Sequence, residues 1–186
     1  KLVIALQSSG PSSIFRKILW IPYALLFRLL SKKVDHFICA SHFEKKLFVE
    51  KLKIPENNFT VIPNGVDAKT IDKIRTVQKP CQIISIGRMV KNKGFHHLVR
   101  AFSIVIVHHP TARLILVGSG PYECEIKKLA TNLRLEKYIT FIPSIHQNQK
   151  EKLLKLLKSS TLFVLLSKYE GQGIIVSESI RAGIQT

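Results

Sequence analysis

The segment from Gln82 to Gly94 reads Gln82-Ile-Ile-Ser-Ile86 followed by Gly87-Arg-Met-Val-Lys-Asn-Lys-Gly94. The first five residues form a short, nearly continuous apolar run, which is typical of a parallel strand buried on both faces. The next eight carry three cations, of which Arg88 and Lys93 stand five residues apart, ahead of an amphipathic stretch that predicts a helix. A loop at the carboxyl end of a strand allows both cations to converge on one anionic ligand. The alternative is a basic loop that simply faces solvent.

The same order of strand, loop and helix recurs along the chain. Apolar runs predict strands at residues 2–6, 36–40, 59–63, 82–86, 113–117, 138–142 and 162–166, and amphipathic runs predict helices at 41–52, 93–109, 121–133 and 147–157. This alternation predicts an α/β fold with a doubly wound, Rossmann-like parallel sheet. The turn-forming stretch Pro63-Asn-Gly-Val-Asp67 divides the chain. We therefore expect residues 1–67 to end one α/β unit, 68–80 to be a linker, and 81–186 to form a second, incomplete unit.

Composition narrows the class of protein. The chain has 186 residues, a formal net charge of +17, 46% hydrophobic and 22% charged residues, which excludes a disordered tail. Three scattered cysteines predict buried, reduced thiols in a cytoplasmic protein. The positive charge favours anionic partners, but it is spread along predicted helices without a nucleic-acid-binding signature, so no nucleic-acid partner is expected. The missing initiator Met and the abrupt end after a helical stretch predict a fragment truncated at both ends.

Two further loops follow predicted strands. In Gly118-Ser-Gly-Pro121, the glycines, Gly120 among them, could let a ligand approach the backbone closely, although an ordinary tight turn is by itself the better explanation. In Glu170-Gly-Gln-Gly-Ile-Ile-Val-Ser-Glu178, the glycines leave backbone N–H groups open at a helix start, which suits a phosphate. Glu178 falls inside that helix, where its carboxylate could accept two hydrogen bonds from a ribose diol. Two surface glutamates paired with lysines are the alternative.

Taken together, the three motifs resemble the retaining glycosyltransferases of family 4, which have the GT-B fold. That family's donor domain carries G-R-x-x-x-x-K-G, V-G-x-G-P and E-G-x-G-x-x-x-x-E after successive strands, and all three occur here in this order. The stretch Val61-Ile-Pro-Asn-Gly-Val-Asp67 matches the family's interdomain junction. The resemblance covers about residues 35–186. It implies the donor-binding C-terminal half of a GT-B protein preceded by the end of the N-terminal half.

This resemblance implies a hexosyltransferase-type enzyme that transfers a glycosyl group from a nucleotide diphosphate sugar, with retention, to an acceptor that the sequence does not identify; a lipid-linked molecule and a glycan are the candidates. We expect no metal or other cofactor, because Arg88, Lys93 and the helix start would stabilise the leaving diphosphate. The resemblance implies catalytic roles for Arg88, Lys93 and Glu170, the two cations binding the donor diphosphate. It implies substrate contacts as follows: Glu178 with the ribose, Gly171, Gln172, Gly173 and Ile174 with the sugar and distal phosphate, Ile145 with the base, and Gly120. The fragment alone should bind donor weakly and turn over little. The sequence departs from the family at Pro143, where a glycine is usual, and at Gln7, the nearest candidate for a histidine that faces the sugar.

Other interpretations stay open at this point. The same fold could serve a non-catalytic nucleotide-binding or scaffold protein, and a basic nucleic-acid-binding domain is a weaker alternative. The apolar segment Ile14–Leu30, flanked by basic residues, predicts either an amphipathic helix at the anionic inner face of a membrane or a helix packed in the core.

Overall fold

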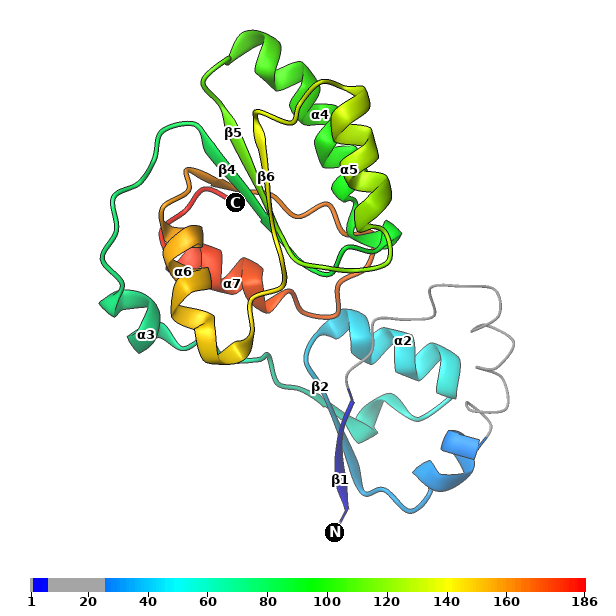
Figure 1. Ribbon diagram of the computed structural model, residues 1–186. Helices are drawn as coiled ribbons and strands as arrows, with labels where there is room; N and C mark the ends of the chain where they lie inside the picture. Colours follow the sequence, from blue (N-terminus) through cyan, green and yellow to red (C-terminus); the bar gives the residue numbers. More distant parts are fainter. Residues whose placement is uncertain (1, 7–25) are drawn as a thin grey trace. The chain divides into compact units, whose positions relative to one another are not determined.

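The computed structural model of the chain describes residues 2–6 and 26–186 (Figure 1). Gln7 and residues 14–25 of the apolar segment lie outside the described residues. The chain divides into two compact units, one made of Lys1–Gly65 with Tyr169–Gly173 and the other of Val66–Lys168 with Ile174–Thr186. The first unit is therefore completed by a short segment from late in the sequence.

The first unit is built on a parallel sheet of β1 (Val3–Leu6), β2 (His36–Cys39) and β3 (Phe59–Val61), in that spatial order. Helix α2 (His42–Leu52) begins as the sequence predicts, because Ser41 Oγ accepts a hydrogen bond from Glu44 N at 3.1 Å. The Glu44 carboxylate accepts a second one from Ala40 N at 3.0 Å. A 3₁₀ turn (Glu56–Asn58) precedes β3. The Phe37 ring stacks on that of Phe59, with ring centroids 5.1 Å apart, at the centre of this unit's core.

The second unit contains a four-stranded parallel sheet covered by helices on both faces. The strands are β4 (Gln82–Ile86), β5 (Arg113–Val117), β6 (Ile139–Ile142) and β7 (Leu162–Phe163), in the spatial order β6-β5-β4-β7. Helices α4 (Phe95–His108) and α5 (Glu123–Asn132) lie on one side of the sheet, and α6 (Lys150–Lys158) and α7 (Ile174–Arg181) on the other (Figure 1).

Alternation along β5 explains this arrangement. Leu114 and Leu116 are buried in the core beneath α4 and α5, whereas Ile115 and Val117 are buried in the core beneath α6. A strand that is apolar on both faces needs a helical layer on each. The doubly wound α/β fold expected from the sequence is confirmed.

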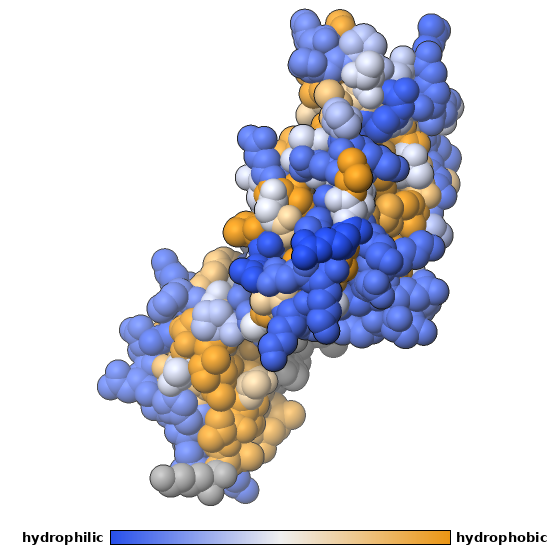
Figure 2. All heavy atoms as spheres, turned by 90° about the vertical axis from the view of Figure 1, so that its left-hand side faces the viewer, coloured by the Kyte–Doolittle hydropathy of each residue, from blue (hydrophilic) through white to orange (hydrophobic). Residues whose placement is uncertain are grey.

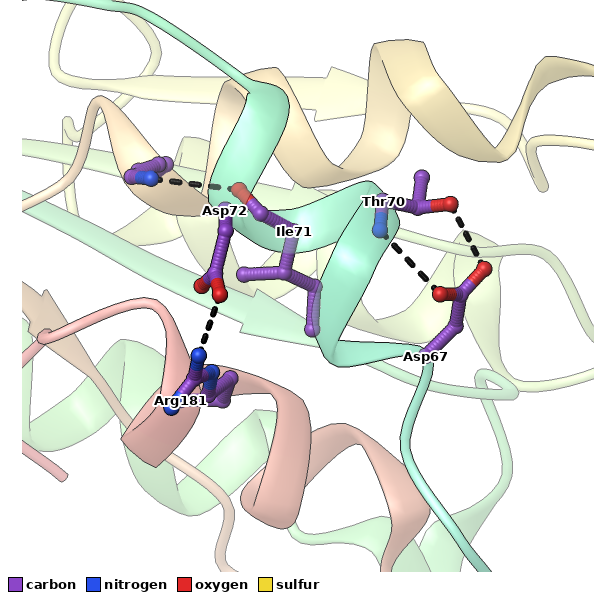
Figure 3. A network of polar contacts seen from close by, with 6 residues as sticks. Asp67, Thr70, Ile71, Asp72 and Arg181 are labelled. Atoms are coloured by element: carbon purple, nitrogen blue, oxygen red, sulfur yellow. Dashed lines mark hydrogen bonds and ion pairs between the residues drawn. The ribbon is translucent and has the colours of Figure 1, made fainter.

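The stretch expected as a linker, residues 68–80, contains helix α3 (Ala68–Lys73). Asp67 caps it by accepting hydrogen bonds from the backbone N–H and the hydroxyl of Thr70. Figure 3 shows the contacts that hold α3, among them an ion pair between Asp72 and Arg181 of α7. Ile71 is buried in the core beneath α6, and its carbonyl accepts a hydrogen bond from Lys158 Nζ at 3.2 Å. This helix is therefore an integral part of the second unit.

Several boundaries differ from the sequence prediction. The helix expected from residue 93 begins at Phe95, because Lys91–Lys93 forms a 3₁₀ turn and Gly94 has a φ of +72°. The helix expected from residue 147 begins at Lys150, after a 3₁₀ turn at Gln147–Gln149. The strand expected at 162–166 pairs only over Leu162–Phe163.

The prediction that the cysteines are buried was wrong for two of the three. Cys39 is fully buried in the core of the first unit, but Cys81 and Cys124 are exposed. Burial, together with the nearby charge of Glu44, raises the pKa of the Cys39 thiol to about 11. This thiol is therefore neutral at physiological pH.

Candidate functional site

The carboxyl edge of the second sheet is formed by four loops joined by hydrogen bonds. The loop after β4 contacts the loop after β5 through Met89 N, which donates to Ser119 O at 3.0 Å. The loop after β6 contacts the same residue, since Ser144 N donates to Ser119 Oγ at 3.1 Å. The segment after β7 reaches the loop after β4, where Lys168 N donates to Asn92 O at 2.8 Å. These contacts hold the loops that carry several of the predicted site residues in one continuous edge.

Glycines permit this close approach of neighbouring loops. Gly118 has a φ of +144°, and a Cβ there would lie 3.0 Å from the carbonyl carbon of Gly87. A Cβ at Gly120 would lie 2.8 Å from the carbonyl carbon of Met89, and one at Gly94 would lie 2.8 Å from the Cβ of Leu166. The crowding atoms belong to the neighbouring loop, so packing alone requires glycine there. The expected contact of Gly120 with a ligand stays a prediction.

The two cations predicted to bind phosphate lie in the loop between β4 and α4. Arg88 is exposed, and Lys93 is partly buried in the 3₁₀ turn. Backbone hydrogen bonds from Val90 N to Arg88 O and from Lys93 N to Val90 O fix the turn that separates them. Gly94 stands at the N-cap position of α4, and within the described part of the chain no side chain caps the free N–H groups of that helix start. Two cations and an uncapped helix start therefore occur together, a combination suited to an anion.

Glu178 occupies a buried position in α7. Glu178 is only 4% exposed as a whole residue, and its Oε1 lies 2.7 Å from Nζ of Lys150, the first residue of α6. The structure thus combines a buried carboxylate with the lysine pairing that the sequence raised only as an alternative. From the sequence, we treated the positive charge as spread along predicted helices, did not single out Lys150 and missed this contact. The one available signal was its place just after the segment expected to meet a base.

Residues 170–173 belong to the first unit. Gln172 contacts both backbone groups of Asn64: its Oε1 accepts from Asn64 N at 2.5 Å, and its Nε2 donates to Asn64 O at 3.3 Å. A Cβ at Gly171 would lie 3.0 Å from Cδ of the buried Glu44. Glu170 and Gly173 are both partly buried. These four residues pack against the first unit, and their predicted contact with a sugar stays a prediction.

The other predicted residues lie in the second unit. Ile145 follows β6 and packs against the core beneath α6, and Ile174 is 38% exposed at the start of α7. Arg88, Lys93, Gly120 and Ile145 therefore lie in the joined loops at the carboxyl edge, while Glu178 is held by the neighbouring helix α6.

His96 is a polar residue of α4 next to this edge. Its ring meets that of Tyr122 edge to face, with centroids 5.5 Å apart, and its buried Nδ1 has no hydrogen-bond partner among the described residues. Burial, followed by the charges of His97, Lys91 and Arg100, lowers the pKa of His96 below its ordinary value of 6.5. Over residues 2–6 and 26–186, His, Cys, Asp and Glu side chains form no cluster of three that could hold a metal ion.

Family models match both parts of the chain. The model described as glycosyl transferases group 1 matches residues 66–186. The chain belongs to the glycosyltransferase group 1 family. The model of glycosyltransferase family 4 matches residues 5–70. The resemblance drawn from the sequence motifs is thus confirmed. The match to group 1 covers every residue of the second unit, including the hydrogen-bonded loops at the carboxyl edge of its sheet.

Curated relatives of this glycosyltransferase chain are longer proteins. An uncharacterized glycosyltransferase of Haemophilus influenzae is 28% identical over 91% of the chain and 49% of its own length. Another from Bacillus subtilis, YqgM, is 31% identical over 89% of the chain and 45% of its own length. The GPI3 subunit of phosphatidylinositol N-acetylglucosaminyltransferase of Saccharomyces cerevisiae is 27% identical over 87% and 36%, respectively. The chain therefore spans half or less of these relatives.

Solved structures of UDP-bound proteins share the fold. Anabaena HepE, in complex with UDP and glucose, is 18% identical, with a TM-score of 0.80 over 98% of the chain and 51% of HepE. The pneumococcal O-GlcNAc transferase GtfA, in complex with UDP and GlcNAc, is 21% identical, with a TM-score of 0.70 over 88% of the chain and 31% of GtfA. The GT-B type of fold expected from the sequence is thereby confirmed.

Proposed function

We propose that this chain is the donor-binding part of a retaining, hexosyltransferase-type glycosyltransferase. The donor is a nucleotide diphosphate sugar, bound at the carboxyl edge of the sheet β6-β5-β4-β7. The single observation that carries the proposal is that the loop with Arg88 and Lys93 is hydrogen-bonded to the loops after β5 and β7. The family relationship supports the reaction class, and the UDP complexes of HepE and GtfA support UDP as the nucleotide.

The chemistry follows from the charge of the leaving group. As the glycosidic bond breaks, negative charge builds up on the departing diphosphate. Arg88 and Lys93 stabilise that charge, Arg88 through a bidentate contact and Lys93 as a compact cation. Backbone N–H groups at the start of α4 add to it. In this proposal the side chains do the work of a metal ion, so the reaction needs none.

The remaining residues have the roles expected from the family. Glu178 binds the ribose diol and Ile145 meets the base. Glu170 acts beside the reacting sugar, together with Gly171, Gln172, Gly173 and Ile174. The acceptor side and full turnover belong to the longer protein, so the chain alone binds the donor and transfers little sugar.

Calorimetric titration of the chain with UDP and with uridine tests the proposal. Removing a charged hydrogen-bonding partner costs about 1.5–3 kcal/mol, so Arg88→Ala or Lys93→Ala should weaken UDP binding by roughly tenfold to a hundredfold. Uridine, which lacks phosphate, should bind nearly as before. Lys91→Ala, an exposed cation of the same 3₁₀ turn, is the matched control. Equal losses for UDP and uridine would show that the two cations do not touch phosphate.

Retention and catalysis require the full-length protein. Incubation with labelled UDP-sugars and an acceptor should give a product with the donor's anomeric configuration, read by NMR coupling constants. UDP binding without any turnover by the full-length protein would favour the non-catalytic alternative.

We further propose that the protein attaches to the anionic cytoplasmic surface of a membrane. Residues 26–31 are helical, and Leu26, Leu29 and Leu30 are 57%, 58% and 54% exposed at a spacing that places them on one helix face. Exposed cations, Lys32 and Lys33, follow directly. Figure 2 shows a separate gathering of apolar side chains on the face of the first unit turned away from this helix. A phosphatidylinositol-modifying relative makes a lipid-linked acceptor a reasonable partner. None of the helices formed by residues 26–186 is long and apolar enough to span a bilayer.

Co-sedimentation with liposomes tests this attachment. Each Lys or Arg near an anionic surface contributes about 1 kcal/mol, so Lys32→Gln/Lys33→Gln should reduce binding to anionic vesicles by roughly tenfold or more. The matched control is Lys127→Gln/Lys128→Gln, which removes two exposed cations from α5. Absence of binding to anionic vesicles, or equal binding to neutral ones, would refute electrostatic attachment.

A further inference from the structure

The buried carboxylate of Glu178 has a cationic partner on another helix. An ionised carboxylate withdrawn from water is costly unless it is paired. Lys150 provides the pairing, with its Nζ 2.7 Å from Oε1. The Lys150 side chain is 34% exposed and that of Glu178 only 6% exposed, so the ammonium reaches inward from the surface to the carboxylate.

The place of Lys150 within α6 is unfavourable for the helix itself. It is the first residue of α6, and in the described structure Gln149 provides no side-chain cap. A helix N-terminus carries partial positive charge, so a cation there opposes the helix dipole. By contrast, Lys158 lies in the last turn, where a cation is favourable, and Lys155 pairs with Glu151 on the same helix. Among the described residues, Glu178 forms the ion pair with Lys150, and Asp67 also lies close enough to interact with its charge.

The helix that bears Glu178 is fixed by a separate contact. Arg181 forms an ion pair with Asp72 of α3 (Figure 3), and Glu178 lies within the helical bounds of α7. What the Lys150 contact determines is therefore the direction of one carboxylate. The ion pair engages Oε1, and a carboxylate has about four acceptor positions in all. Within the described part of the chain no hydrogen bond or ion pair engages the second oxygen, so its acceptor capacity is left for a ligand.

We propose that Lys150 is a positioning residue for the nucleoside: it holds Glu178 ionised and oriented so that the carboxylate can accept hydrogen bonds from both ribose hydroxyls. The proposal rests on the ribose role proposed above for Glu178. Lys150 acts through Glu178 and not by contact with the ribose. Its effect should therefore appear as discrimination between ribose and deoxyribose, and not as general affinity for nucleotides.

The test compares UDP with 2′-deoxy-UDP by calorimetric titration of the chain. In Lys150→Met, the affinity for UDP should fall about tenfold, whereas that for 2′-deoxy-UDP should fall less than about threefold, so that the preference for ribose shrinks. Lys150→Arg, which preserves the charge, should restore most of the preference. Lys155→Met is the matched control, since it removes an ion-paired lysine from the same helix, and should leave the preference unchanged.

Glu178→Gln separates this proposal from the one on which it rests. An unchanged preference in Glu178→Gln, or no UDP binding by the unmodified chain, would overturn the proposed donor site itself. Loss of preference in Glu178→Gln but not in Lys150→Met would overturn only the role of Lys150. Parallel losses for both ligands in Lys150→Met would show a merely structural contact and would also overturn it. Should Lys150→Met not fold, Lys150→Ser keeps a polar side chain that is favourable at the helix start but is too short to reach Glu178, and an unchanged preference in that variant would refute the proposal.

Discussion

Replacement of Gly118 by alanine should destabilise the second unit by about 4 kcal/mol, because two separate penalties coincide there. The φ of +144° lies in a region that residues with a Cβ avoid, at a cost of about 1–3 kcal/mol. The new Cβ would also lie 3.0 Å from the carbonyl carbon of Gly87 and closer still to its oxygen. Since the obstacle is backbone in a hydrogen-bonded loop, relief requires movement of the loop, which costs about 1–3 kcal/mol more.

Thermal unfolding followed by far-UV circular dichroism measures this effect. About 4 kcal/mol corresponds to a decrease in Tm of roughly 8–16 °C for a chain of this size. Gly183→Ala is the matched control in the same unit, because Gly183 has a φ of +74° but no described atom within 4 Å of its Cβ position. Backbone strain alone should cost about 1–2 kcal/mol there. Equal decreases in Tm for the two variants would show that the loops after β4 and β5 do not crowd each other.

Three further results are expected. In the native protein, a thiol reagent should modify the two exposed cysteines quickly and Cys39 only after unfolding, since Cys39 is buried with a pKa of about 11. Mass spectrometry of the labelled peptides measures the order of modification, and early labelling of Cys39 would contradict the prediction. Because folding lowers the pKa of His96, the unfolded chain binds a proton at this residue more readily, and the free energy of unfolding should decrease as pH falls below 6.5. The Tm of His96→Gln should therefore depend less on pH than that of the native protein. Identical profiles of Tm against pH for the two proteins would contradict the prediction. Gln172→Ala should speed hydrogen exchange at the Asn64 amide about tenfold, as expected for loss of one hydrogen bond, and unchanged exchange would show that the Gln172 contact does not protect that amide.

Local sequence patterns were sufficient for the elements that position the site. The bounds of β4 and β5 agree with the sequence prediction because both strands are apolar on two faces and end at a glycine. The cap of α2 was predictable because Ser41 and Glu44 lie within one turn. The placement of Arg88 and Lys93 at a strand's carboxyl end required only the order of strand, loop and helix.

Contacts between distant residues could not be predicted in this way. The hydrogen bonds of Gln172 with Asn64 join residues 108 positions apart. Lys150 differs from Lys155 and Lys158 in its place at the start of α6, but its contact with Glu178 depends on how two helices pack. Cys81 is exposed just before β4, outside any strand or helix, and Cys124 is exposed because it lies on the outward face of α5, which only the tertiary structure determines.

The return of residues 169–173 to the first unit has a consequence for recombination between relatives. The chain passes from one unit to the other three times, after residues 65, 168 and 173, so neither unit corresponds to one uninterrupted stretch of gene. A chimera joined at residue 65 would bring five residues of foreign origin against Glu44 and Asn64. A chimera that takes its second unit from another family member should therefore fold more often when residues 169–173 come from the same protein as the first unit than when they come from the donor of the second unit.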